Sequence, residues 1–357
     1  MQRIAFDDFR RDPARWANQL GVSRAAIDLY LASEVIDLHV DSFIWTRALG
    51  YDLRARHGAG LLGGRIYSQV DLPRVLEACM GGAMWSITTN PWRSAAGRAR
   101  SFARNLARVQ GVFESVADQF RIVRNASEYA AARAAGLHAA LLAVQGGNAF
   151  DPELDVLRDG SIVRVTLVHL TNSEFGATSS PLHIGRQGGL SARGRAFVEG
   201  LNARRIFVDL AHIDRRGFFD AAEVHDRSQP LIVTHTGVSG VYASWRNIDD
   251  EQLRLVADTG GVVGVVFHGQ YLSGHYLSGG PLSAVVDHLA HIVRVAGADA
   301  AALGSDWDGA IIPPKQLRSC LGLPHLVQGM LDRGFSHTTI QKILGGNFLR
   351  ALRQLRP

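Results

Sequence analysis

The sequence predicts an α/β fold, a (β/α)8 TIM barrel preceded by a helical N-terminal extension. Eight short apolar runs recur from about residue 35 onward, amphipathic helical segments separate them, and polar side chains directly follow several of the runs. Apolar runs of this length, rich in Val, Ile and Leu, are typical of parallel strands that are buried on both faces. Long connections between such strands imply right-handed crossovers, and eight strand–helix units can close into a barrel.

The order of the elements follows from these runs. Residues 1–30 are expected to form the helical extension, and the Gly-containing segment 46–72 to form a long loop over the barrel mouth. Helical patterns over 189–205, 248–260 and 281–297 separate later strands. The predicted strands cover residues 35–40, 83–88, 139–144, 162–168, 205–210, 231–235, 261–267 and 300–305.

A doubly wound open sheet is the alternative fold. No G-x-G-x-x-G motif follows the first predicted strand, and polar residues follow more strands than a single crevice would use. No Pro/Ser-rich linker divides the chain. We therefore expect residues 1–357 to form a single domain, with the barrel over 35–352.

Composition and charge exclude several classes of protein. Of the 357 residues, 46% are hydrophobic and 20% are charged, as in globular proteins with a sizeable core. No apolar stretch approaches the roughly 20 residues of a membrane span, and the N-terminus lacks the apolar core of a signal peptide, so we expect a cytoplasmic protein without membrane association. The net charge of +5 comes from scattered arginines without a basic run, which argues against nucleic-acid binding.

Imidazole and carboxylate side chains stand at or just after the ends of five predicted strands, where a barrel keeps its active site. Residues two apart in an extended strand point to the same side, so His39 and Asp41 can bind one ion together. Their nitrogen and oxygen donors suit zinc or another borderline divalent metal. A lone histidine at a strand end is usually structural, and the prediction depends on the whole set: His39, Asp41, His169, His212, His235 and Asp306.

Short motifs along residues 35–352 resemble those of one enzyme family. They are DLHVD (37–41), GGAMWS (81–86), TLVH (166–169), GLS (189–191), VDLAH (208–212), THT (234–236), RN (246–247), GSDWDG (304–309) and GGNFLR (345–350). In this order they resemble the membrane dipeptidase (renal dipeptidase) family, peptidase family M19 of the amidohydrolase superfamily. The resemblance implies a barrel of the metal-dependent hydrolase type that holds two zinc ions and hydrolyses dipeptides.

The resemblance also implies metal ligands. His39 and Asp41 match the ligands of one ion, and His212 and His235 match those of the other. At the end of the third predicted strand, the family places a Glu that bridges the two ions, within a Glu-Gly-Gly motif. This chain has Gln145 there, followed by two glycines.

The neutral amide of Gln145 brings no negative charge, and two dications a few ångströms apart repel strongly unless anions lie between them. The carbamylated lysine found elsewhere in the superfamily has no counterpart, because Lys315 and Lys342 both lie beyond the last predicted strand. Gln145 is therefore a doubtful ligand, and we expect one zinc ion per chain rather than two.

Three further residues carry roles that the resemblance implies for the substrate. His169 matches the residue that contacts the scissile carbonyl, and Arg246 matches the residue that binds the substrate carboxylate. Asp306 matches the catalytic acid or base. These roles suit the chemistry of amide hydrolysis, which needs an activated water, a group that stabilises the oxyanion and a proton carrier.

Three functions remain open at this point. The first is a metal-dependent hydrolase of dipeptides or small N-acyl amino acids with a free carboxylate, which acts through metal-activated water at an altered, mononuclear centre. The second is a barrel repurposed for another small-molecule reaction, such as natural-product tailoring by lyase or isomerase chemistry. The third is a binding protein or pseudoenzyme that has lost turnover. Metal content would separate the three, and a homodimer is left open.

Overall fold

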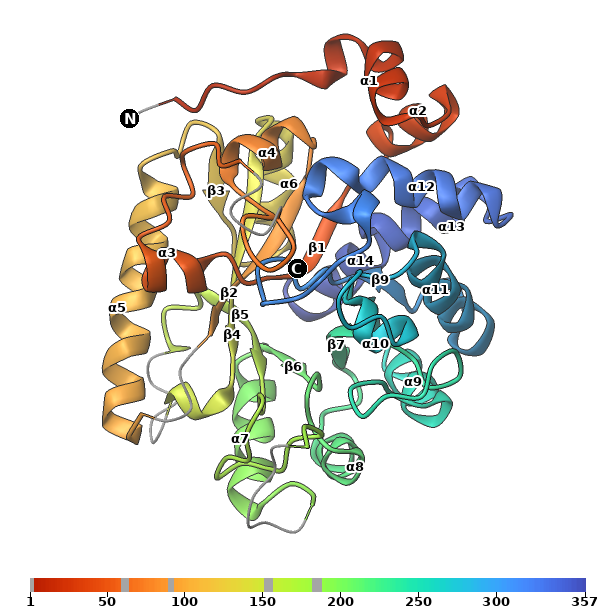
Figure 1. Ribbon diagram of the computed structural model, residues 1–357. Helices are drawn as coiled ribbons and strands as arrows, with labels where there is room; N and C mark the ends of the chain where they lie inside the picture. The colour runs from red at the N-terminus through yellow and green to blue at the C-terminus, as the bar shows by residue number, and fades with distance from the viewer. Residues whose placement is uncertain (1–2, 59–63, 89–92, 151–156, 182–187) are drawn as a thin grey trace.

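The structure is a computed structural model that describes residues 3–58, 64–88, 93–150, 157–181 and 188–357 (Figure 1). Within these residues, eight parallel strands close a barrel in the order β1–β2–β4–β5–β6–β7–β8–β9, and β9 pairs with β1. The predicted (β/α)8 barrel is confirmed. The strands are β1 Ile36–Val40, β2 Gly82–Thr88, β3 Phe120–Ile122, β4 His138–Gln145, β5 Ile162–Thr166, β6 Phe207–Asp209, β7 Ile232–Thr236, β8 Val262–Val265 and β9 Ala301–Leu303.

Each of the eight predicted apolar runs overlaps one barrel strand, with ends that differ by at most two residues. β4 shows why, because all eight of its residues, HAALLAVQ, are buried. β3 was not predicted and lies outside the closed ring, and the one strand of the described residues with which it pairs is β4, at its start. It has three residues, and Arg121 in its centre is exposed, so the sequence shows no continuous apolar run there.

The N-terminal extension is helical, as predicted. A short 3-10 turn, η1 (Phe9–Arg11), precedes α1 (Pro13–Leu20) and α2 (Arg24–Leu31). Asp12 caps α1 by accepting a hydrogen bond from Arg15 N, and Ser23 caps α2 in the same way through Ala26 N. α2 packs against α12 (Leu323–Asp332) on the outside of the barrel (Figure 1).

Helices surround the barrel and fill the connections between its strands (Figure 1). The predicted helices over 189–205, 248–260 and 281–297 are present as α7, α9 and α11. Among the described residues, no helix combines the length and the apolar character that crossing a membrane requires. The helices are α3 Phe43–Leu49, α4 Leu72–Glu77, α5 Ala95–Glu114, α6 Ala126–Ala134, α7 Ala192–Ala203, α8 Arg215–Val224, α9 Asp250–Asp258, α10 Gly269–Ser273, α11 Leu282–Ala296, α13 His337–Gln341 and α14 Asn347–Leu355, with short turns η2 Gly147–Phe150, η4 Lys315–Leu317, η5 Cys320–Gly322 and η6 Lys342–Gly346.

The connection after β1 is partly helical rather than one long loop. α3 extends to Leu49 and α4 begins at Leu72, so only residues 50–71 are a loop, and 59–63 of these lie outside the described residues. The loop is tied to the carboxyl end of β9, because Gln69 N donates to Asp308 Oδ1 over 2.8 Å and Val70 N donates to Asp308 Oδ2 over 3.3 Å. It therefore lies at the barrel mouth, as expected.

Candidate active site

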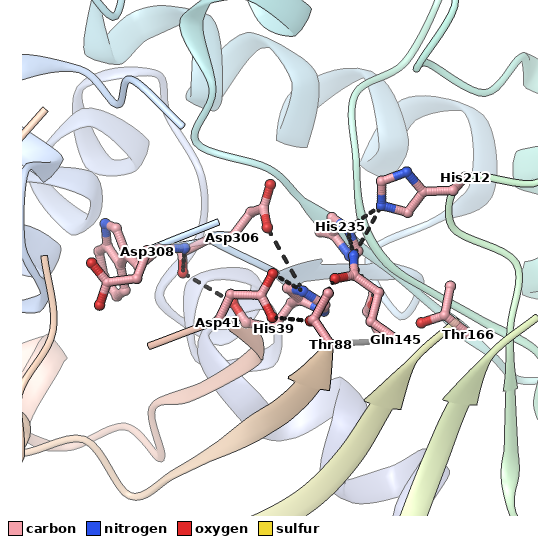
Figure 2. A network of polar contacts seen from close by, with 12 residues as sticks. His39, Asp41, Thr88, Gln145, Thr166, His212, His235, Asp306 and Asp308 are labelled. Atoms are coloured by element: carbon pink, nitrogen blue, oxygen red, sulfur yellow. Dashed lines mark hydrogen bonds and ion pairs between the residues drawn. The ribbon is translucent and has the colours of Figure 1, made fainter. Parts of the chain in front are cut away.

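The parallel strands bring the predicted polar side chains together at one end of the barrel (Figure 2). His39 lies in β1 and His235 in β7, while Gln145 is the last residue of β4. Asp41 directly follows β1, and Arg246 lies in the loop after β7. The other three predicted residues lie shortly after the ends of β5, β6 and β9: His169, His212 and Asp306. Except for half-buried His169, the side chains of this set are buried: His39, Asp41, Gln145, His212, His235, Arg246 and Asp306.

Two histidines and Gln145 form one half of the site (Figure 2). The Nε2 atoms of His212 and His235 are 2.9 Å apart. The side-chain amide nitrogen of Gln145 lies 3.0 Å from His212 Nε2 and 3.2 Å from His235 Nε2. Thr88 Oγ1 lies 3.0 Å from Gln145 Oε1, on the other side of the amide.

His39 and two carboxylates form the other half. His39 Nε2 lies 3.4 Å from Asp41 Oδ2 and 3.7 Å from Asp306 Oδ1. The His39 ring stacks on the His235 ring with centroids 3.8 Å apart, so the two halves touch. His39, His235 and Asp306 each offer a ligand atom, and these atoms all lie within 4.8 Å of one another.

Beneath the histidines lies a polar network whose centre is Asp209, the last residue of β6. Asp209 Oδ2 accepts hydrogen bonds from Thr166 Oγ1 (2.6 Å) and Thr234 Oγ1 (2.7 Å). Its Oδ1 accepts from the backbone N–H groups of Ala211 and Thr234. Arg164 Nη1 lies 3.5 Å from Oδ2, and Arg164 Nη2 lies 2.9 Å from His39 Nδ1.

Thr88, Arg164 and Thr234 also belong to the site, although they were not predicted from the sequence. The sequence offered a cue for Arg164, since it is a charged residue inside the apolar run 162–168, in a strand expected to be buried on both faces. Threonine is common in strands for packing reasons, so Thr88 and Thr234 carried no comparable cue.

Two of the site residues have a left-handed backbone. φ is +66° at His212 and +63° at Asp306, a region that few non-glycine residues adopt. The His212 carbonyl is held by Thr178 Oγ1 and Ser179 N, and Asp306 N donates to His39 O. Surrounding hydrogen bonds therefore maintain a conformation that is typical of functional positions and that the sequence alone does not reveal.

Burial changes the ionisation of the site. It lowers the pKa of His212 and His235 well below the ordinary value and lowers that of His169 to about 4, so these imidazoles are neutral at pH 7. Burial raises the pKa of Asp306 well above its ordinary value, and the nearby Asp41 carboxylate raises it further. Burial would also raise the pKa of Asp41, but contacts with His39 and Thr88 outweigh it. The two carboxylates are thus differentiated, as a proton carrier and an anion require.

Arg246 lies on the loop between β7 and α9. Its Nη2 donates to the His235 carbonyl over 2.6 Å, which among the described residues is the only hydrogen bond of its guanidinium. Arg246 and His212 line a cavity of ≈ 180 Å³ together with Trp245. A buried guanidinium with unused donors beside a cavity can bind a carboxylate.

His235 fits a metal ligand. The Thr234 hydroxyl gives its one proton to Asp209, so toward His235 Nδ1 (2.9 Å) it can only accept. The His235 proton therefore resides on Nδ1, and the Nε2 lone pair points at His212 and Gln145. An oxygen acceptor behind the ring is the usual support of a metal-binding histidine. Exchanging the oxygen and nitrogen of the Gln145 amide, which heavy-atom positions do not distinguish, would turn its carbonyl toward the same point.

Comparison with known proteins agrees with this geometry. The sequence profile of the membrane dipeptidase family (peptidase family M19) matches residues 23–356. The chain belongs to this family. Dipeptidase aclJ of Aspergillus oryzae is 27% identical over 341 residues, covering 88% of this chain and 76% of that protein. A Klebsiella pneumoniae protein described as uncharacterized, in the pqqA 5' region, is 35% identical over 169 residues, and the match spans 47% of this chain and 61% of that protein.

Solved structures of a probable dipeptidase and a metallopeptidase share the fold. The probable dipeptidase PvdM of Pseudomonas aeruginosa superposes with a TM-score of 0.81 at 17% identity, over 95% of this chain and 98% of PvdM. A metallopeptidase of Rhodobacter sphaeroides, liganded with a phosphinate mimic of the dipeptide L-Ala-D-Ala, gives a TM-score of 0.79 at 22% identity, over 90% of this chain and 99% of that one. This M19 chain thus has the dipeptidase barrel, and the family consists of metal-dependent hydrolases.

Proposed function

We propose that this M19 chain hydrolyses dipeptides or small N-acyl amino acids that carry a free carboxylate, with one zinc ion per chain. The observation that supports this most directly is the pair of Nε2 atoms, on His212 and His235, that converge within 2.9 Å while an acceptor behind His235 holds its proton away from the centre. The pool from which the ligands of this ion and the proton carriers are drawn is His39, Asp41, His212, His235 and Asp306. A divalent ion in this centre would polarise an amide carbonyl and lower the pKa of a water molecule.

Three side chains around the centre bind the substrate, stabilise its carbonyl oxygen and transfer a proton. Arg246 binds the substrate carboxylate through the guanidinium donors that His235 O leaves unused. His169, whose ring centroid is 4.7 Å from that of His212, borders the same side of the site and steadies the oxygen of the scissile carbonyl. Burial and the nearby Asp41 carboxylate raise the pKa of Asp306 well above its ordinary value, which suits Asp306 to carry a proton to the leaving amine.

A dipeptide panel assayed with chelated and zinc-reconstituted protein tests the proposal. We expect turnover only in the zinc-reconstituted samples, including turnover of L-Ala-D-Ala, the dipeptide whose mimic binds the Rhodobacter metallopeptidase. C-terminal amides of the same peptides should be poor substrates. Equal rates with and without zinc, or no hydrolysis of any acid in the panel, would contradict the proposal.

A further inference from the structure

The proposed function does not use Arg164, a completely buried arginine in β5. Its Nη1 donates to Thr166 Oγ1 over 2.6 Å and to the Val144 carbonyl over 3.1 Å. Its Nη2 lies 2.9 Å from His39 Nδ1. β1 and β5 are not neighbours in the barrel, so this contact crosses the barrel interior directly beneath the site.

The contact determines which nitrogen of His39 can carry a proton. A guanidinium only donates hydrogen bonds, so His39 Nδ1 must accept and cannot hold a proton itself. The proton of the neutral ring is therefore on Nε2, the atom that faces Asp41 Oδ2 at 3.4 Å and Asp306 Oδ1 at 3.7 Å. A nitrogen that carries a proton has no lone pair to offer a metal ion. His235, stacked on His39, has the opposite tautomer and is free to bind one.

The charge around the centre leads to the same conclusion. Among the described residues, three guanidinium groups and four carboxylates lie close enough to influence one another electrostatically: Arg47, Arg164, Arg246, Asp37, Asp41, Asp209 and Asp306. With every carboxylate ionised, they carry one net negative charge, which disfavours a second dication more strongly than the first. Relative to a centre with a bridging glutamate and a neutral residue at 164, Gln145 removes one negative charge and Arg164 adds one positive charge. Together they equal the charge of one divalent ion.

We propose that Arg164 takes the place of the second metal ion: its guanidinium supplies the positive charge in the His39–Asp41 half, and the single ion binds at His212 and His235. The inference rests on the proposed function because it concerns the same centre. It assigns Arg164 a positioning role, since Arg164 acts on the centre through His39 and Asp209.

Zinc content of four variants tests the proposal. Protein equilibrated at micromolar free zinc is analysed for zinc per chain as wild type, Gln145→Glu, Arg164→Gln and the double variant. Glutamine at 164 is neutral, and its carbonyl can accept a proton from His39 Nδ1, which frees Nε2 as a ligand. We expect one zinc in the wild type and in Gln145→Glu, and two in the double variant. The second ion should bind the double variant ~100-fold or more tightly than it binds Gln145→Glu.

Two further variants separate charge from packing. Arg164→Lys keeps the positive charge without the guanidinium fork and should hold one zinc even when combined with Gln145→Glu. Asp41→Asn in the wild type should leave the zinc content at one per chain, because Asp41 is not a ligand of the retained ion. Loss of that zinc in Asp41→Asn, or two zinc ions in Gln145→Glu alone, would overturn the proposal.

The wild type provides a measurement that does not depend on the folding of any variant. An anomalous difference map at the zinc edge should show one peak, between His212 and His235, and ¹⁵N NMR should show the His39 proton on Nε2. A peak between His39 and Asp41, or a proton on His39 Nδ1, would refute the role of Arg164. Two ions with zinc-dependent dipeptide hydrolysis would overturn this inference and the single-ion stoichiometry but leave the proposed hydrolysis standing, whereas one ion without hydrolysis would overturn the proposed hydrolysis alone.

Discussion

His39 and His235 stack on each other at the centre of the barrel mouth, yet their surroundings are opposite. The Thr234 hydroxyl lies next to His235 Nδ1; it donates its own proton to Asp209 and can therefore only accept from the ring. Behind His39 stands Arg164, which can only donate. The two imidazoles therefore differ in tautomer: His235 has a free lone pair on Nε2, whereas His39 carries its proton on Nε2.

The difference shows that ligand residues alone do not define a metal centre. The group hydrogen-bonded to the far side of an imidazole fixes its tautomer, and the charges beneath it determine whether another cation is tolerated. A comparison of ligand motifs would count both halves as metal sites. The contacts of Arg164 and Thr234 distinguish them.

The strongest test of this comparison removes a histidine from the half that fits an ion. His212→Ala should weaken zinc binding by more than about 100-fold and abolish turnover, since even residues behind the ligands contribute 10- to 100-fold to metal affinity. His169→Ala is the control, because His169 packs edge-on against His212 at 4.7 Å but is assigned to the substrate. It should retain zinc and lose about 100-fold in kcat, the usual effect of removing an oxyanion donor.

Zinc titration with a competing chelator, followed by assay at saturating zinc, separates the two effects. If His169→Ala loses the ion as well, His169 belongs to the metal centre.

Substitutions of Arg246 test how the substrate carboxylate is bound beside His212 and His235. A partly buried guanidinium–carboxylate contact is worth about 2 to 4 kcal/mol, so Arg246→Ala should lower kcat/KM for a free acid by ~30-fold or more. Arg246→Lys should recover only part of this loss, because one ammonium cannot reproduce the two-pronged contact. The neutral amide of the same peptide is the control substrate. An equal loss for acid and amide would show that Arg246 does not bind the carboxylate.

Two threonines offer a matched comparison between the halves. Thr234 and Thr166 both donate to Asp209 Oδ2, but Thr234 supports His235 whereas Thr166 accepts from Arg164. Thr234→Val should weaken zinc binding about 10-fold, the lower end of the usual effect for a residue behind a ligand. Thr166→Val removes a similar hydrogen bond and should change zinc affinity much less. Equal effects would mean that Asp209, rather than the His235 tautomer, transmits the change.

The sequence predicted the barrel because its strands are continuous apolar runs, and it predicted the imidazole and carboxylate positions because these residues stand at strand ends. It did not predict α3, which has only seven residues and whose Trp45 indole donates to the distant Asp308 carbonyl. Helices of this length depend on such tertiary contacts. The pairing of Arg164 with His39 was likewise hidden, because it exists only when the closed barrel places β5 across from β1.

A buried histidine outside the site shows what burial alone does to the protonation of an imidazole in this barrel. His138, in β4, lies next to Met80 O, 2.9 Å from its Nδ1, and burial lowers its pKa to about 3. In the unfolded chain, the His138 imidazole has its ordinary pKa of 6.5 and binds a proton below that pH. In the folded chain it binds a proton only near pH 3, so between these two pH values only the unfolded chain is protonated at His138. Folding stability should therefore fall with decreasing pH, by about 1.4 kcal/mol per unit from this group.

Asp308 changes folding stability with pH in the opposite direction to His138. Burial raises the pKa of Asp308 to about 6, so the folded chain binds this proton more readily than the unfolded chain. The slope of the wild type alone therefore does not isolate His138, and the measurement is the difference between wild type and His138→Asn. Urea unfolding at several pH values from 6 to 4 should give a stability that declines less steeply in the variant, although the variant is less stable at pH 7. Parallel slopes would show that His138 does not stay neutral in the folded chain, and that burial alone does not suppress protonation of a histidine in this barrel wall.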